Sequence, residues 1–152
     1  MGVAAQNSKY VTIVPPAAIV DNASYTTAEI DTLGWDYAKI VVHLGATDIA
    51  MTALAVTESD VTASGHANVT GLIVGTSVDS DGTTSVLPSA TDDDKFFVFD
   101  IDLRGRKRFL DLTATAGNGT AGTYLTAWCE LSRGNETPTT AAQRGAQHVL
   151  RV

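Results

Sequence analysis

Residues 94–115 contain two runs in which apolar and polar side chains alternate, separated by a short charged turn. The side chains expected on one face are Phe97, Phe99, Ile101 and Leu103 in the first run, and Leu110, Leu112 and Ala114 in the second. An alternation with a period of two is typical of a pleated strand with one buried face. Gly105 can adopt the positive φ that a tight turn often needs. The pattern predicts an antiparallel β-hairpin with its turn at residues 104–107.

The turn of this predicted hairpin is strongly basic. Four of the five consecutive positions 104–108 are cations, namely Arg104, Arg106, Lys107 and Arg108. Acidic residues flank them, namely Asp100, Asp102 and Asp111. Local charge balance explains these carboxylates well. The turn is therefore either a solvated loop balanced by nearby aspartates or a surface for an acidic partner.

Length and composition limit the fold and the functions that this chain can have. The chain has 152 residues and a net charge of −7, with 18% charged residues. That length fits one domain with a sizeable core. The acidic balance disfavours general nucleic-acid binding, because phosphate would meet like charge. No apolar run reaches the roughly 18 residues of a membrane helix. The first residues lack the pattern of a signal peptide, so we expect a chain made and kept in a cytoplasm.

Further alternating runs along the chain predict about eight strands with polar turns and no βαβ units. Asn118-Gly119 predicts a second tight hairpin. Thr26 and Glu29 fit a helix capping box, but the threonine-rich segment favours a strand around 27–31. The fold class expected is all-β: an antiparallel β-sandwich, jelly-roll-like.

The two ends of the chain differ in character from this sandwich. We expect an extended N-terminal arm at residues 1–9, the sandwich at 10–134 and a C-terminal tail at 135–152. Within the tail, Thr137-Pro138 and Gly145 can bound a short helix over 139–144. The segment His148–Val152 alternates and can either fray or add a strand to a neighbour's sheet edge.

No motif of known catalytic or cofactor chemistry occurs in the sequence. Asp79-Ser80-Asp81-Gly82 resembles the start of a calcium loop, but the later ligands and flanking helices are missing, so a turn is expected. The run 92–94 of three aspartates is interpreted as a solvated acidic turn. Cys129 lies in a strand-like run and is expected to be a buried core thiol. We assign no catalytic residue, no metal site and no cofactor.

Three segments together resemble a family of structural proteins from the heads of tailed bacteriophages. They are Glu29–Tyr37, Gly45–Ala50 leading to Val56–Asp60, and the basic segment Asp100–Leu110. The resemblance covers roughly residues 25–145, and the basic segment is its most specific part. It implies a capsid decoration, or cement, protein: a β-sandwich bound to the outside of the assembled shell.

This resemblance carries no catalytic residues over to the chain. It implies a non-enzymatic virion protein, located on the capsid exterior, with the major capsid protein as its partner and with self-association as a dimer or trimer. The basic side chains Arg104, Arg106, Lys107 and Arg108 are then the candidates for contact with acidic groups of the shell, since Arg pairs bidentately with carboxylates.

Two other functions remain open at this level. A carbohydrate-binding or fibre-type module would use exposed Trp35, Tyr37 or Trp128 as stacking platforms, although such aromatics are more often buried in a core. A tail-tube or connector component would instead expose a ring-forming interface. Two or three coplanar exposed rings would favour the carbohydrate-binding module.

Overall fold

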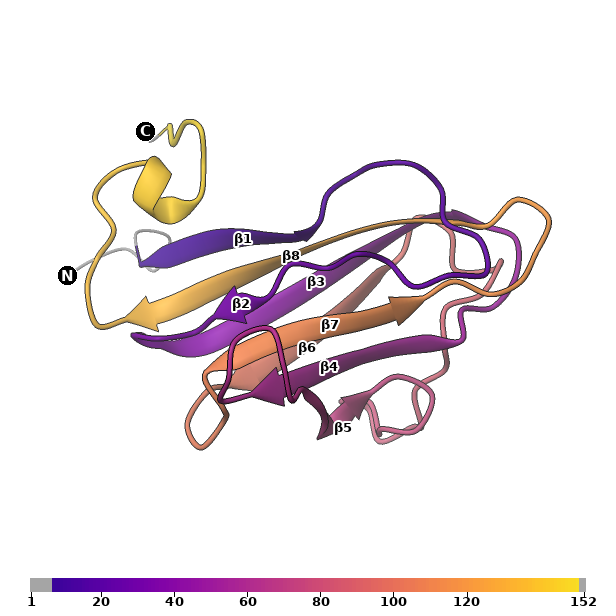
Figure 1. Ribbon diagram of the computed structural model, residues 1–152, viewed down its shortest axis with the longest axis horizontal. Coiled ribbons are helices and arrows are strands. Elements are labelled where there is room, and N and C mark those ends of the chain that lie inside the picture. The colour runs from indigo at the N-terminus through magenta and orange to yellow at the C-terminus, as the bar shows by residue number, and fades with distance from the viewer. Residues whose placement is uncertain (1–6, 151–152) are drawn as a thin grey trace.

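The computed structural model describes residues 7–150, and they form a sandwich of two antiparallel sheets (Figure 1). The eight strands are β1 (Ser8–Val14), β2 (Ile30–Asp31), β3 (Trp35–Thr47), β4 (Ala53–Ser59), β5 (Ala67–Ile73), β6 (Phe96–Asp102), β7 (Phe109–Thr115) and β8 (Thr123–Gly134). A single short 3₁₀ turn in this part of the chain, η2 (Ala142–Arg144), follows β8. The expected all-β sandwich is confirmed.

The order of the strands is that of a jelly roll. One sheet has the order β1-β8-β3-β6 and the other β2-β7-β4-β5. Four antiparallel pairs are nested, β1 with β8, β2 with β7, β3 with β6, and β4 with β5. This arrangement is a long folded hairpin wrapped into two layers, as jelly rolls are.

The predicted hairpin at residues 94–115 is wrong in its pairing. Its two runs are strands, but β6 pairs with β3 in one sheet and β7 pairs with β2 and β4 in the other. The loop 103–108 crosses from one sheet to the other, a separation of about 10 Å that a tight two-residue turn does not span. Gly105 does adopt a positive φ, at 77°.

The second predicted hairpin, at Asn118-Gly119, is wrong for the same reason, because β7 and β8 lie in different sheets. The loop between them is held by carboxylates. Asp48 accepts hydrogen bonds from the amides of Thr120 and Ala121, both at 2.6 Å, and Asp21 accepts one from the Gly119 amide at 3.0 Å. Among the described strands, β4 and β5 are the only consecutive pair joined within one sheet.

The core lies between the two sheets, and the alternating runs predicted its faces correctly. In β6, Phe99 and Ile101 point inward, while Phe96 and Val98 point outward with 58% and 50% of their surface exposed. The other inward side chains follow the same period of two: Ala38, Ile40, Val42, Leu44, Leu54, Val56, Leu110, Leu112, Ala114, Leu125, Ala127, Cys129 and Leu131.

Several local predictions are met in part. The strand expected around 27–31 is present as the short β2, and no helix forms there. The helix expected over 139–144 is reduced to η2, which ends at Gly145 with φ of 70°, as predicted. Residues 148–150 belong to no helix or strand, and 151–152 lie outside the described residues.

The N-terminal part is more ordered than expected over its last residues. Residues 1–6 of the predicted arm lie outside the described part of the chain, but Ser8 and Lys9 already belong to β1. The buried Arg144 fixes the C-terminal segment to this strand: its Nε donates to the Ser8 carbonyl and its Nη2 lies by the Ser8 hydroxyl, both at 3.2 Å. The turn η2 therefore lies beside β1, at the edge of its sheet (Figure 1).

Candidate interaction surface

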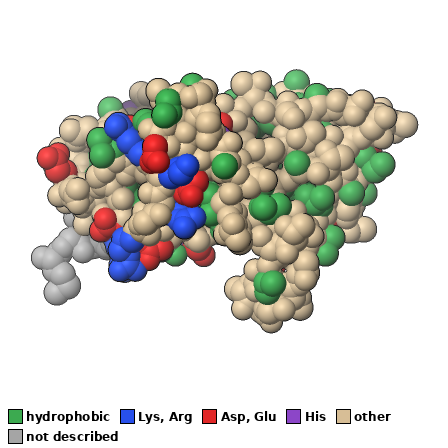
Figure 2. Space-filling model, turned by 60° about the horizontal axis from the view of Figure 1, so that its bottom comes forward, with side chains coloured by type: hydrophobic (Ala, Val, Ile, Leu, Met, Phe, Trp, Pro, Cys, Tyr) green, Lys and Arg blue, Asp and Glu red, His purple; other side chains and the backbone are tan. Residues whose placement is uncertain are grey.

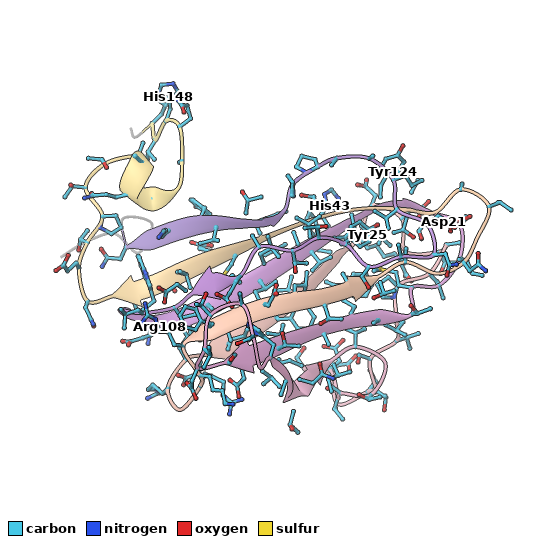
Figure 3. The ribbon with its side chains drawn as sticks, in the orientation of Figure 1. Asp21, Tyr25, His43, Arg108, Tyr124 and His148 are labelled. Carbon is cyan, nitrogen blue, oxygen red and sulfur yellow. The ribbon has the colours of Figure 1, made fainter. Side chains whose placement is uncertain are left out.

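The four cations named as candidate binding residues all lie in or beside the loop 103–108, here called the basic loop. It lies at one end of the sandwich, where it joins β6 to β7 (Figures 1 and 3). Four side chains from a single loop are necessarily close, but the sequence did not show what faces them. Three of the four meet a carboxylate.

Arg108 makes the most ordered of these contacts. Its Nε and Nη2 donate to the two carboxylate oxygens of Asp31, on β2, at 2.8 and 2.7 Å. The guanidinium also lies 4.8 Å from the ring centroid of Phe109, a cation–π distance. The hydrogen bond from Arg108 lowers the pKa of Asp31 below its ordinary value. This pair joins the start of β7 to its edge neighbour β2.

Arg104 contacts the carboxylate two residues before it. Its Nε donates to both oxygens of Asp102, at 2.9 and 3.0 Å, its Nη2 also contacts Oδ2, and its amide donates to Oδ1 at 3.0 Å. These contacts, with the Arg104 side chain as the largest cause, lower the pKa of Asp102 to about 2. The local charge balance considered for the flanking aspartates is thus present at Asp102.

Arg106 and Lys107 share one acceptor on the neighbouring sheet. Glu58, on β4, accepts from Arg106 Nη1 at 3.4 Å and from the Lys107 amide at 3.1 Å. The Lys107 ammonium forms no ion pair with any residue in the range 7–150. Figure 2 shows the result, with basic and acidic side chains interleaved at this end of the molecule. Lys107 is therefore the basic-loop cation that retains an unbalanced charge.

A second surface, of which only Trp128 was named from the sequence, lies on the outer face of the sheet β1-β8-β3-β6. Here Phe96, His43 and Trp128, from three adjacent strands, form what we call the aromatic patch. The rings of His43 and Phe96 stack with centroids 4.4 Å apart and planes 22° apart, and the Trp128 ring meets Phe96 edge-on at 6.5 Å and 85°. The sequence signal was the apolar pair Phe96 and Val98 on the otherwise polar face of the first alternating run.

His43 is held in the patch by a neighbouring turn. Its Nε2 lies 3.0 Å from a carboxylate oxygen of Asp94, which has a positive φ of 63°. The other aspartates of this acidic turn have separate partners: Asp92 contacts Lys95 at 3.0 Å, and Asp93 accepts from the Thr47 amide at 2.9 Å. The three carboxylates thus hold the turn before β6.

The other residues considered for metal binding or for nucleophilic chemistry have structural roles. In the predicted turn near Asp79, Asp81 accepts hydrogen bonds from the amide and hydroxyl of Thr83 at 2.8 and 2.6 Å. Cys129 is fully buried, as predicted, and burial raises the pKa of its thiol to about 12, which opposes a nucleophilic role. Within residues 7–150, no three His, Cys, Asp or Glu side chains gather as a metal site would need.

The aromatic residues considered as sugar platforms are only partly exposed. Trp35, Tyr37 and Trp128 are all half-buried, and Trp35 packs against the core. The ring contacts on the outer face are a stacked pair and a perpendicular pair, so the patch is not a set of coplanar exposed rings. A flat sugar face stacks on coplanar rings, so this geometry does not favour the carbohydrate-binding alternative.

Comparisons with protein-family models, curated proteins and solved structures find no match to this chain. Within the described residues, no helix has the length and apolar character needed to cross a membrane.

Proposed function

We propose that this chain is a non-enzymatic structural protein of a tailed-bacteriophage head, which binds the outside of the assembled capsid and stabilises it. The proposal rests on the family resemblance of the three segments in residues 29–110 and is supported by the jelly roll, an architecture used by viral capsid domains. It names the major capsid protein as the partner and assigns no catalytic residue.

The structural observation that carries the binding part of the proposal is the aromatic patch. The inner face of its sheet is fully used by the core, yet Phe96 leaves 58% of its surface exposed on the outer face. Exposed clusters of large apolar side chains usually mark interaction sites, and aromatic residues are enriched among the residues that dominate binding. A rigid sheet holds these rings in place, so little ordering cost accompanies binding.

The basic loop supplies a second contact in this proposal. Arg104, Arg106 and Arg108 already neutralise carboxylates of the same chain, so their role in the proposal is to keep the loop in shape. Lys107 presents the charge available to acidic groups of the shell. A protein that binds only the assembled shell stabilises it by mass action, and many copies multiply the effect.

Co-sedimentation of the purified chain with empty expanded shells tests the proposal. We expect Phe96→Ser to weaken binding about tenfold or more, as loss of a central aromatic contact does. Val61, 60% exposed in the loop after β4, provides the matched control, and Val61→Ser should bind like the wild type. Lys107→Glu should weaken binding and leave the melting temperature unchanged.

Two results would refute parts of this proposal separately. A folded wild-type chain that stays in the supernatant at all shell concentrations would refute capsid decoration itself. Unchanged occupancy of folded Phe96→Ser or Lys107→Glu would remove the aromatic patch or the basic loop, respectively, as the contact.

A further inference from the structure

The strand β6 has an edge that no other described strand covers. It is the last strand of the sheet β1-β8-β3-β6 and pairs on one side with β3. Two hydrogen bonds at the ends of this pairing fix its phase: Leu44 donates to the Lys95 carbonyl, and Leu103 donates to the Asp36 carbonyl. Bonded pairs alternate in an antiparallel ladder, so Phe97, Phe99 and Ile101 bond to β3. The amides and carbonyls of Phe96, Val98 and Asp100 therefore point to the open edge.

A groove runs beside this open edge. It has a volume of about 550 Å³ and lies between β6 and the end of β5, the facing edge strand of the other sheet. Its wall includes Val78, Val86 and Val98, which are 64%, 76% and 50% exposed. An edge strand with free backbone groups beside exposed valines is a template for an added strand.

The same molecule carries a segment suited to this edge. Residues 146–150 follow η2 and end in His148-Val149-Leu150, which belong to no helix or strand, and Leu150 is 92% exposed. Figure 3 shows His148 projecting from the sandwich at a corner of the molecule. A segment that lies outside every described strand and carries an exposed leucine is available to pair with a free sheet edge.

The charges of the two surfaces are complementary. The groove includes the carboxylates of Asp79 and Asp100, and Asp79 forms no ion pair among residues 7–150. From Thr137 onward the sequence contains no acidic residue, and Arg151 directly follows the proposed strand. The approach of this segment to the groove is therefore electrostatically favourable.

The segment starts beside β1, so it is too short to pair along β6 of its own copy. Arg144 fixes it to Ser8 on β1, and β1 and β6 are the opposite edges of the sheet. Three strand spacings separate these edges, or about 14 Å. Residues 146–150 extend at most about 17 Å, so crossing the sheet would take about four of these five residues and leave one beside β6 of the same copy.

We propose that residues 146–150 of one copy of this chain add as a strand to the β6 edge of a second copy. The free amides and carbonyls of Phe96, Val98 and Asp100 pair with the backbone of the added strand, and Leu150 covers the exposed valines of the groove. This self-association uses the edge of β6, requires no capsid, and stands independently of the proposed function.

The test measures the oligomeric state of the full chain by sedimentation velocity over a range of concentrations, without shells. We expect a concentration-dependent dimer or larger species, and Leu150→Asp should raise its dissociation constant about tenfold or more. Val61→Asp, the same apolar-to-acidic change at an exposed valine far along the chain, is the control and should leave the constant unchanged.

A second variant and a second measurement locate the acceptor. Val98→Pro removes an amide that points to the open edge and spares the bonds to β3, as proline on an edge strand does. It should weaken association as Leu150→Asp does. Hydrogen exchange of the wild type reports on the same amide without mutation, and the Val98 amide should gain protection as concentration rises.

The proposal is overturned if the wild type is monomeric at every concentration, or if Leu150→Asp leaves the dissociation constant of the oligomer unchanged. Protection of the Val98 amide in a monomer, lost in Leu150→Asp, would also overturn it, because the strand would then come from the same copy. None of these results involves shell binding, so capsid decoration is judged separately.

Discussion

The buried thiol of Cys129 makes the folding stability of this protein sensitive to alkaline pH. The residue lies in the middle of β8, opposite Val11 and Ile40, with none of its surface exposed. Burial, the largest cause, raises its pKa from 9.0 to about 12. The folded state thus holds a proton that the unfolded state releases first. This stabilisation is complete below about pH 9 and is lost as the pH rises toward 12.

The size of the effect follows from these two pKa values. At pH 10 about nine-tenths of the unfolded thiols are ionised, against about one in a hundred of the folded ones. The unfolded state is then favoured by on the order of 1 kcal/mol relative to pH 8, where the thiol is largely protonated in both states. A loss of that size is a large fraction of the stability of a small domain.

Urea denaturation at pH 8 and pH 10, with a reductant present, measures this loss. Cys129→Ala removes the thiol and leaves a small cavity whose cost is the same at both pH values. Other groups, including Tyr25 with its pKa raised to about 12 by burial, contribute equally to both proteins. The wild type should therefore lose on the order of 1 kcal/mol more than the variant between the two pH values. Equal losses would refute the argument that the folded state keeps this thiol protonated.

Two further predictions concern the core and the basic loop. Leu110→Ala, at a fully buried position of β7, should lower the free energy of unfolding by about 2–5 kcal/mol. Val61→Ala, at an exposed position, should change the free energy of unfolding by less than about 0.5 kcal/mol. Comparable effects of the two variants would mean that the core is misplaced. Because Arg108 lowers the pKa of Asp31, their pair stabilises the fold above the ordinary aspartate pKa and loses this contribution as pH falls. Acid titration of Arg108→Gln should show a weaker loss than the wild type, and an identical acid profile would show that the pair adds nothing to stability.

The sequence predicted which side chains of β6 and β7 are buried, but not which strands they pair with. An alternation of apolar and polar residues specifies a buried face, since a slip of one residue would reverse it. The partner strand is set by contacts far along the chain, and the loop 103–108 is compatible with either a turn within one sheet or a crossing between two. The jelly roll resolves this choice by placing consecutive strands on opposite layers, with β4 and β5 the exception among the described strands.

The contacts of the basic loop and of the aromatic patch likewise could not be predicted from the sequence. The sequence identified the cations of the basic loop and the aspartates beside them. It did not reveal that Asp31, 77 residues before Arg108, and Glu58, 48 residues before Arg106, would accept their hydrogen bonds. The aromatic patch is assembled from three strands that are adjacent only in the folded sheet. Its one local signal was the apolar pair Phe96 and Val98 on the polar face of an alternating run.

The proposal that this chain decorates a capsid is tested most directly by identifying its neighbours in a purified particle. Cross-linking through lysine side chains, followed by mass spectrometry, reports these neighbours residue by residue. Lys39 lies on the outer face that carries the aromatic patch, and Lys107 lies in the basic loop. We expect cross-links from both lysines to the major capsid protein. Particles that lack the chain, or cross-links confined to tail or fibre subunits, would contradict the account.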